Sequence, residues 1–416
     1  MTESWSHQIA SNLGVELDES LRTWFDEAWW ARQGTGEFTS ALSPQRLIDL
    51  DGEVIWPGFL PPDLLPVIGN DYGDWMCLRI GLANEVSEIV YWNHGGGDWI
   101  PFGPSLPEAL LYAASLRATE QDEFASTVWP TWAAEQLSRS GKHIMPFWET
   151  GAKVDPLSAL VEAGVAQAPV GRDLCLKRLR RPGQEMADRE KAKALGVPWE
   201  PNFVSWLFDS SLAPESQRSA LWDGGRGDAN AGFEQDWNGA ELEALRIERV
   251  RGNLGWPMDL AGWAAERRGD LQQAIPRYWS SLKASVFSDE SVRFRTLWFP
   301  EGYGKFAAAR LWEHRELLSE LQRSDPYLSL LWENDRTSLR ARVSRFWLRI
   351  AEEESRQRNW RAAFDAYMRA GWDVGMAQRE DYVEVLTGLR CVAIELGAKA
   401  LTRCISNHLR LMESHQ

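Results

Sequence analysis

A histidine between aromatic residues and a run of glycines is a natural place to look for chemistry in this sequence. The stretch YWNHGGGDW places His94 directly before Gly95, Gly96 and Gly97 and four residues ahead of Asp98. A histidine can act as a general base or bind a metal ion, but a base needs a nucleophile beside it and a metal site needs further ligands. The same loop offers only Asp98. We therefore expect His94 and the three glycines to form a turn, in which the imidazole makes a local hydrogen bond.

Acidic side chains gather in the same part of the chain. A pair of carboxylates could serve acid–base chemistry such as glycoside hydrolysis. These residues fall at expected strand ends and loops of an acid-rich segment, so a solvated rim is favoured over a catalytic pair. The phosphate-binding glycine motifs, the GxSxG elbow and the HExxH zinc motif do not occur in the sequence. We therefore predict no catalytic residue, no metal site and no cofactor. The carboxylates considered are Asp71, Asp74, Glu85, Glu88 and Asp98.

Three segments around these residues have strand character. In DWMCLRIG (residues 74–81) side chains follow the two-residue period of a half-buried strand, and SEIVYWN (residues 87–93) repeats this signal. DWIPF (residues 98–102) can pair with the second strand across the HGGG loop, because glycine adopts the positive φ values of a tight turn without strain. The sequence therefore predicts an antiparallel arrangement with a hairpin at the glycines.

Helical patterns flank these strands. In LDESLRTWFDEAWW (residues 17–30) the apolar residues share one helical face, and Asp18 stands at the N-cap position. In SLPEALLYAASL (residues 105–116) Ser105 and Glu108 have the spacing of a capping box. A helix, antiparallel strands and a second helix predict an α+β N-terminal domain at residues 1–120.

The rest of the chain is predicted to be mainly α-helical. Residues 121–250 carry interrupted helical patterns and are interpreted as a connector, and residues 251–416 as a helical domain. Two segments of this domain echo each other at an offset of 89 residues, which aligns Ala274 with Ala363 and Tyr278 with Tyr367. This spacing resembles degenerate tetratricopeptide-type hairpins, although 89 is not a multiple of the 34-residue period. We expect a repeat-like stack of helical hairpins.

The charge of the chain is concentrated at one end. The net charge is −15; residues 1–150 contain 22 acids and 7 bases, whereas the remaining residues contain 38 of each. This argues against nucleic acid as a partner and favours either a basic protein partner or solubility. The 24 tryptophans are spread along the chain and are interpreted as core residues rather than sugar-binding platforms.

Compartment and redox state follow from two further features. The sequence has neither an apolar run long enough to span a bilayer nor the pattern of a signal peptide at its start. We therefore expect a cytoplasmic protein without membrane contact. The four cysteines form no CxxC pair, so they are expected to be reduced and buried.

The first third of the chain resembles the SUKH superfamily, which includes the fungal cell-wall assembly regulator and many bacterial immunity proteins. The resemblance covers about residues 7–116 and rests on the order of several short motifs: an LGxxL helix start, a strand after a GD pair, an aromatic-x-H turn and a final helix that begins at a serine. It implies a binding domain without enzymatic activity whose members neutralise toxins by direct contact or mediate protein interactions. The matching residues include Gly73, Asp74, Tyr91, Trp92, His94 and Ser105.

These observations together predict a non-enzymatic protein-binding protein. An acidic sheet surface formed by Asp71, Asp74, Trp92 and Asp98 would dock a basic partner, either a toxin domain or a host protein. In the alternative, the C-terminal hairpins act as a scaffold that binds the partner and the SUKH-like domain is an accessory. The sequence leaves the oligomeric state open.

Overall fold

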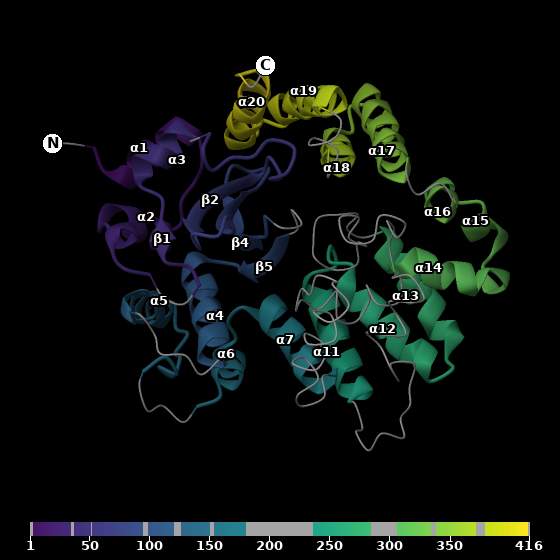
Figure 1. Ribbon diagram of the computed structural model, residues 1–416, viewed down its shortest axis with the longest axis horizontal. Helices are drawn as coiled ribbons and strands as arrows, with labels where there is room; N and C mark the ends of the chain where they lie inside the picture. Colours follow the sequence, from purple (N-terminus) through teal and green to yellow (C-terminus); the bar gives the residue numbers. More distant parts are fainter. Residues whose placement is uncertain are drawn as a thin grey trace, which may run out of the picture. The chain divides into compact units, whose positions relative to one another are not determined.

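The chain folds into two units, and the first of them is built from both ends of the sequence (Figure 1). The sheet unit comprises Met1–Val170 and Ser344–Gln416, and the helical unit comprises Gly171–Val343. This division differs from the three successive domains expected, because the last helices of the chain group with the N-terminal part. The computed structural model describes residues 3–34, 37–50, 52–94, 99–119, 126–149, 154–179, 236–283, 306–333, 338–371 and 379–414.

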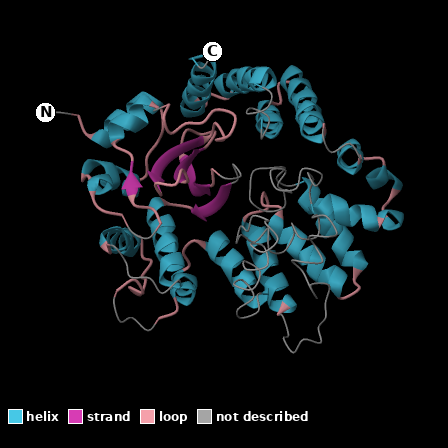
Figure 2. Cartoon of the chain, in the orientation of Figure 1, coloured by secondary structure: helices cyan, strands magenta, loops and turns pink. Residues whose placement is uncertain are grey.

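An antiparallel sheet lies in the sheet unit, with strand order β1-β2-β3-β4-β5 (Figure 2). The structure confirms the three predicted strands as β3, β4 and β5, and it adds β1 and β2. Trp92 of β4 pairs with Trp99 of β5, as the predicted hairpin requires, whereas Gly95, Gly96 and Gly97 lie outside the described residues. An α+β sheet region accompanied by many helices is therefore confirmed. The strands are β1 (Ser40–Ala41), β2 (Leu64–Gly69), β3 (Trp75–Ile80), β4 (Val86–Trp92) and β5 (Trp99–Gly103).

One face of the sheet packs on α4 (Leu106–Thr119) through aromatic rings. Phe102 lies between Tyr91 and Tyr112, with ring centroids 5.5 and 4.8 Å away, and Phe38 closes the cluster at 5.8 Å. The pairs of Phe102 with Tyr112 and with Phe38 are edge-to-face, a geometry that stabilises a core beyond the area that the rings bury. These phenylalanine and tyrosine contacts hold α4 against the strands.

The helices before and after the sheet follow the predicted pattern, with two corrections. Asp18 caps the second helix, since its carboxylate accepts a hydrogen bond from the backbone N–H of Leu21 at 2.8 Å. This helix ends at Asp26 rather than extending to residue 30, and Ala28 adopts a left-handed conformation with φ of 55°. The helices of this part are α1 (Trp5–Leu13), α2 (Glu19–Asp26), α3 (Pro44–Asp49), α5 (Val128–Arg139) and α6 (Pro156–Ala163).

The second correction concerns Glu108, which the sequence placed in a capping box with Ser105. Glu108 is buried, and its carboxylate instead accepts hydrogen bonds from Lys142 Nζ and from the backbone N–H of Ala166, each at 2.7 Å. A buried carboxylate needs such partners to offset its desolvation. Glu108 therefore ties α4 to two later segments.

The C-terminal helices attach to the sheet through the turn between β3 and β4. Asn84 in this turn has φ of 67°; its side chain donates to Gly397 O at 3.2 Å and accepts from the backbone N–H of Ala400 at 3.0 Å. A second link is the hydrogen bond from Asn407 Nδ2 to Leu50 O at 3.2 Å. Figure 1 shows α20 near α1, which it contacts. The helices are α17 (Leu339–Arg356), α18 (Trp360–Gly371), α19 (Arg379–Glu395) and α20 (Lys399–Ser414).

In the helical unit, ion pairs join neighbouring helices. We call Glu266, Tyr278, Arg310 and His314 the Glu266 cluster. The Glu266 carboxylate accepts hydrogen bonds from Tyr278 Oη at 2.8 Å and from Arg310 Nε at 3.1 Å, and His314 Nε2 lies 3.0 Å from it. The cluster thus joins three helices through one carboxylate. The helices of this part are α7 (Gln167–Leu179), α11 (Trp237–Val250), α12 (Trp256–Arg267), α13 (Leu271–Lys283), α14 (Phe306–Glu313), α15 (Glu320–Arg323) and α16 (Pro326–Trp332).

Tyr278 and Tyr367, which align at the offset of 89 residues, both pack on glycines, but in different ways. A Cβ atom added to Gly262 of α12 would lie 2.6 Å from the Tyr278 ring, and one added to Gly388 of α19 would lie 2.4 Å from the Tyr367 ring. Tyr278 thus contacts the preceding helix and Tyr367 the following one. The two segments share residue types without sharing this contact.

Candidate functional site

The turn between β2 and β3 is held by its own side chains. We call residues 70–74 the Tyr72 turn. Asn70 is buried, and its Oδ1 accepts hydrogen bonds from the backbone N–H groups of Tyr72 and Asp74 at 3.0 and 3.1 Å. Asp71 and Gly73 have φ values of 61° and 101°. Aspartate and glycine are among the residues that tolerate such left-handed backbone, so the sequence NDYGD suits this turn.

Asp74 lies at the base of this turn and is the centre of a hydrogen-bond network. Its carboxylate accepts from Asn70 Nδ2 and Tyr91 Oη, both at 2.9 Å, and from the backbone N–H of His94 at 2.8 Å. The side chain of His94 adds a contact of 2.7 Å through Nδ1. Asp74 is only 8% exposed. Its predicted place on a docking surface is therefore corrected: Asp74 positions the turn and does not face solvent.

His94 occupies a turn, as predicted, but its partner was not foreseen. The ring bonds to Asp74 across the turn and lies against Gly73, where an added Cβ would come within 3.2 Å of His94 Cγ. An aspartate–histidine pair can orient a general base, but this needs a nucleophile within reach. In the described part of the chain the hydrogen bonds of the His94 side chain go to Asp74 alone. Among the described residues, no nucleophile is hydrogen-bonded to the His94 ring.

Trp92 was expected on the partner surface, and the structure corrects this. It is 1% exposed, and its ring lies edge-on to Trp56 and Phe59, with centroids 6.2 and 5.6 Å away. Trp75 and Trp99 pair with it on the adjacent strands. Trp92 is thus a core residue of the second face of the sheet, as the general interpretation of the tryptophans as core residues would have suggested.

The exposed residues of the Tyr72 turn are Asp71 and Tyr72. Asp71 accepts hydrogen bonds from the hydroxyls of Thr39 and Ser40 at 3.0 and 3.1 Å, so its carboxylate is fixed although exposed. Tyr72 is 81% exposed. Tyr72 was not among the residues predicted to bind a partner, and its place between Asp71 and Gly73 in an acid- and glycine-containing turn was the available signal. Asp98, the fourth residue of the predicted surface, lies outside the described residues.

A second cluster of charges lies on the same face as Trp92. We call Asp63, Arg79 and Glu88 the Arg79 cluster. Arg79 Nε lies 3.2 Å from Asp63 Oδ2, Nη1 lies 2.6 Å from Glu88 Oε1, and the guanidinium stacks 3.5 Å from the centre of the Trp99 ring. Glu88 is buried and is therefore not part of a solvated rim.

The Arg79 cluster contains one cation and two acids. Burial raises the pKa of Asp63 above its usual value; Arg79 opposes this shift and Glu88 adds to it. The arrangement is a structural ion cluster of the sheet rather than an acid–base pair open to a substrate.

Other kinds of site find little support in the described residues. No three histidine, cysteine, aspartate or glutamate side chains among them lie close enough together to hold a metal ion. Cys77, Cys175 and Cys404 are buried as expected, whereas Cys391 is exposed, contrary to the prediction. Among the helices described, none combines the length and the apolar character that crossing a bilayer requires.

The chain was compared with models of protein families, with curated proteins and with solved structures, and none of the three comparisons finds a match.

Proposed function

We propose that the protein is a non-enzymatic binding protein whose sheet unit docks a basic protein partner through the Tyr72 turn. The observation that carries this proposal is a tyrosine, 81% exposed, on a turn that Asn70 and Asp74 hold in place. Tyrosine is enriched among the residues that dominate binding energy. An anchor on a fixed turn loses little conformational entropy when a partner binds.

The charge of the surrounding segment defines the chemistry of the partner. Residues 1–150 contain 22 acids and 7 bases, and Asp71 lies beside Tyr72 with its carboxylate fixed in position. A surface of this kind attracts a basic protein and repels an acidic one. Asp71 and Tyr72 thus replace Asp74 and Trp92 in the predicted surface.

The resemblance to the SUKH superfamily supports a more specific version of this role. In that version the protein acts in the cytoplasm as an immunity protein, neutralising a toxin by direct contact. The repeat-like character of the C-terminal helices is part of the same proposal, and it would make the chain larger than a simple one-domain immunity protein.

The alternative places the partner on the C-terminal helices. Ile394 of α19 supports it, because this apolar side chain is 57% exposed. Cutting the chain near residue 250 would not separate the two versions, since residues 344–416 belong to the sheet unit. Point substitutions on the two surfaces separate them without removing part of the fold.

The test is capture of the partner from the native host with the tagged full-length chain, followed by measurement of the Kd. We expect Tyr72→Ala to weaken binding by about 10- to 100-fold, the range for a central aromatic anchor. Asp71→Asn keeps a residue that tolerates positive φ and removes the charge, so it should weaken binding less and reduce the salt dependence.

Tyr72→Phe is the matched control, since it keeps the ring, and Ile394→Ala probes the alternative surface. If Ile394→Ala releases the partner and Tyr72→Ala does not, the C-terminal helices carry the binding. Retention of the partner at unchanged Kd by both Tyr72→Ala and Asp71→Asn contradicts the proposal.

A further inference from the structure

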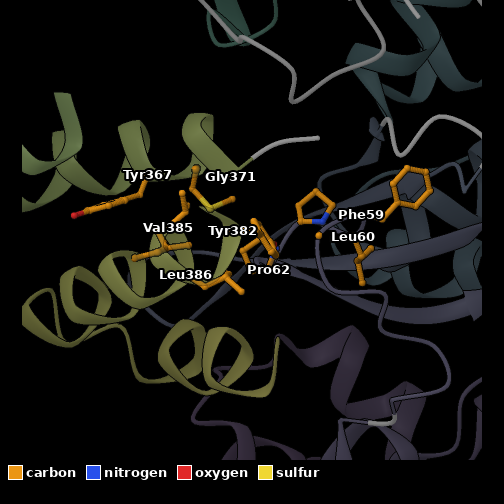
Figure 3. Close-up of a pocket in the computed structure, with 12 residues that line it drawn as sticks. Phe59, Leu60, Pro62, Tyr367, Gly371, Tyr382, Val385 and Leu386 are labelled. Carbon is orange, nitrogen blue, oxygen red and sulfur yellow. The ribbon is translucent and has the colours of Figure 1, made fainter. Parts of the chain in front are cut away.

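The tyrosines of the sheet unit differ in how much of the ring they leave open to a partner. A pocket beside the loop that precedes β2 is lined by Tyr367 and Tyr382 (Figure 3). These two side chains are only 7% and 2% exposed, so their rings are already packed within the unit. Tyr72 is the opposite case, because 81% of its surface is exposed. The Tyr72 turn therefore offers an aromatic face that the pocket does not.

Beside this open ring lies a carboxylate that is held in position. Asp71 accepts hydrogen bonds from Thr39 Oγ1 at 3.0 Å and from Ser40 Oγ at 3.1 Å, one to each of its oxygens. Hydroxyl donors orient a carboxylate without neutralising its charge, and each oxygen can accept a second hydrogen bond. Within the described residues, neither Asp71 nor Tyr72 is paired with a lysine or an arginine. The two side chains are thus available to a cationic group of a partner.

A second carboxylate is tied to the same turn. Glu37 is exposed, and its Oε1 accepts a hydrogen bond from Asn70 Nδ2 at 2.8 Å. Asn70 directly precedes Asp71, and Glu37 lies two residues before Thr39, which bonds to Asp71. Glu37 therefore adds negative charge near Asp71 and Tyr72.

The chain itself holds two arginines by carboxylates and an aromatic ring together. In the Arg79 cluster the guanidinium pairs with two carboxylates and lies 3.5 Å from the centre of the Trp99 ring. In the Glu266 cluster Arg310 bonds to the carboxylate and lies 4.8 Å from the centre of the Trp263 ring. A planar guanidinium can donate from its edge and stack through its face at the same time. A carboxylate beside an open ring therefore fits this group.

We propose that the Tyr72 turn binds an arginine side chain of its partner, with the guanidinium face on the Tyr72 ring and its N–H groups donating to Asp71. This inference rests on the proposed function and names the chemical group that the docking surface selects. Electrostatic attraction alone would treat lysine and arginine alike. Lysine fits less well, because its compact ammonium neither stacks as a plane nor donates to a carboxylate as a fork.

Fluorine NMR of the full-length protein labelled with meta-fluorotyrosine tests this proposal. The chain contains eight tyrosines, and loss of one resonance in Tyr72→Phe assigns the Tyr72 signal. The probes are acetyl-Gly-Arg-Gly-amide and its lysine and citrulline counterparts, of which the citrulline peptide keeps the planar shape without the charge. We expect a saturable shift of the Tyr72 signal with the arginine peptide, about threefold weaker binding of the lysine peptide and no saturable shift with the citrulline peptide.

Substitution of the carboxylates tests the ion pair. Asp71→Asn removes the charge and keeps a residue that tolerates positive φ, so it should weaken binding of the arginine peptide by about fivefold. Glu37→Gln should weaken it by about twofold, since Glu37 adds charge without being the proposed hydrogen-bond partner. Glu413→Gln removes an exposed acid of α20 and is the matched control, which should leave binding unchanged.

The proposal is overturned if the arginine peptide does not shift the Tyr72 signal, if the lysine or citrulline peptide binds equally well, or if Asp71→Asn binds the arginine peptide as tightly as the unaltered protein does. Partner capture distinguishes this failure from failure of the proposed function. A partner that is lost with Tyr72→Ala, while the lysine and arginine peptides bind equally, leaves the docking surface in place and rejects only its selectivity for arginine. Retention of the partner by both Tyr72→Ala and Asp71→Asn rejects the docking surface itself.

Discussion

Two of the buried ion clusters among the described residues, the Arg79 cluster and the Glu266 cluster, have opposite charge balance. In the Arg79 cluster of the sheet unit one guanidinium lies between two carboxylates, whereas in the Glu266 cluster of the helical unit one carboxylate receives several donors. Burial dominates at Asp63 and raises its pKa. Burial opposes ionisation of Glu266 as well, but the hydrogen bonds and positive charge of Arg310, together with His314 and Tyr278, outweigh it and lower the pKa. The number of donors per carboxylate, rather than burial alone, sets the direction of the shift.

The same contrast holds for the whole of each unit. The sheet unit contains 34 acids and 19 bases, whereas the helical unit contains 26 of each. The net charge of −15 therefore belongs entirely to the sheet unit, and the excess acid extends into its interior at Asp63 and Glu88. The electrostatic potential of the sheet unit therefore attracts a cationic ligand or partner more strongly than that of the helical unit, whose charges balance. The proposed docking surface at the Tyr72 turn lies on the sheet unit.

The largest expected effect comes from removing Arg79, and the matching change in the Glu266 cluster removes Arg310. Arg79→Met leaves two carboxylates close together without a cation, and we expect the free energy of unfolding of the sheet unit to fall by about 3–5 kcal/mol. Arg310→Met leaves Glu266 with Tyr278 and His314, so the helical unit should lose less, about 2 kcal/mol. Hydrogen exchange read separately over the amides of each unit in the full-length chain measures both losses.

Adding Glu88→Gln to Arg79→Met relieves one of the two uncompensated charges and should recover part of the loss. An equal loss in the two units, or a larger one for Arg310→Met, would show that charge balance does not distinguish the clusters.

An effect smaller than that of Arg79→Met is expected from the buried histidine of α20. His408 is 1% exposed, and burial lowers its pKa to about 3 from an ordinary value of 6.5. The unfolded chain therefore binds a proton below pH 6.5 that the folded chain does not bind. The free energy of unfolding of the sheet unit should fall by about 3 kcal/mol between pH 7 and pH 4.5 through this group alone.

Chemical denaturation of the full-length chain at the two pH values measures the loss, and His408→Leu should remove this part of it. His143 is exposed, so His143→Gln is the control and should leave the acid-dependent loss unchanged. The same pH dependence in His408→Leu as in the unaltered protein would contradict the assignment.

How far the sequence predicted the fold depended on the range of the interactions involved. The strands β3 and β4 follow from alternation and β5 from pairing across the glycine loop. The strand β2 follows from neither, because all six of its residues are buried and no alternation marks it. The attachment of the C-terminal helices depends on Asn84 and Ala400, which are 316 residues apart in the chain. No local pattern encodes such a pair.

The candidate site shows the same limit at shorter range. A turn at His94 is predictable from the glycines that follow it. Its hydrogen-bond partner Asp74, however, lies 20 residues earlier in the chain, before β3, whereas His94 follows β4. Residue type suggested Asp74 and Trp92 as surface groups, although hydrogen bonding and ring packing bury both. Exposure of Tyr72 depends on what the surrounding fold leaves uncovered, which its own neighbours in the sequence do not reveal.

The smallest expected effect is a difference in sign between two neutralised carboxylates. The folded state holds a proton on Asp63 more strongly than the unfolded state does, because the pKa is raised, so this group stabilises the sheet unit increasingly as the pH falls toward the ordinary carboxyl range. Glu266 has a lowered pKa, so its contribution is present above the ordinary carboxyl value and is lost as the pH falls below it. Asp63→Asn and Glu266→Gln should therefore change the slope of unfolding free energy against pH in opposite directions, each by at most about 1.4 kcal/mol per pH unit.

Denaturation of both variants from pH 7 to pH 4, with Glu413→Gln as the exposed control, measures these slopes. Slopes that change in the same direction would mean that the two carboxylates share one electrostatic environment, and the contrast between the units would then not extend to their interiors.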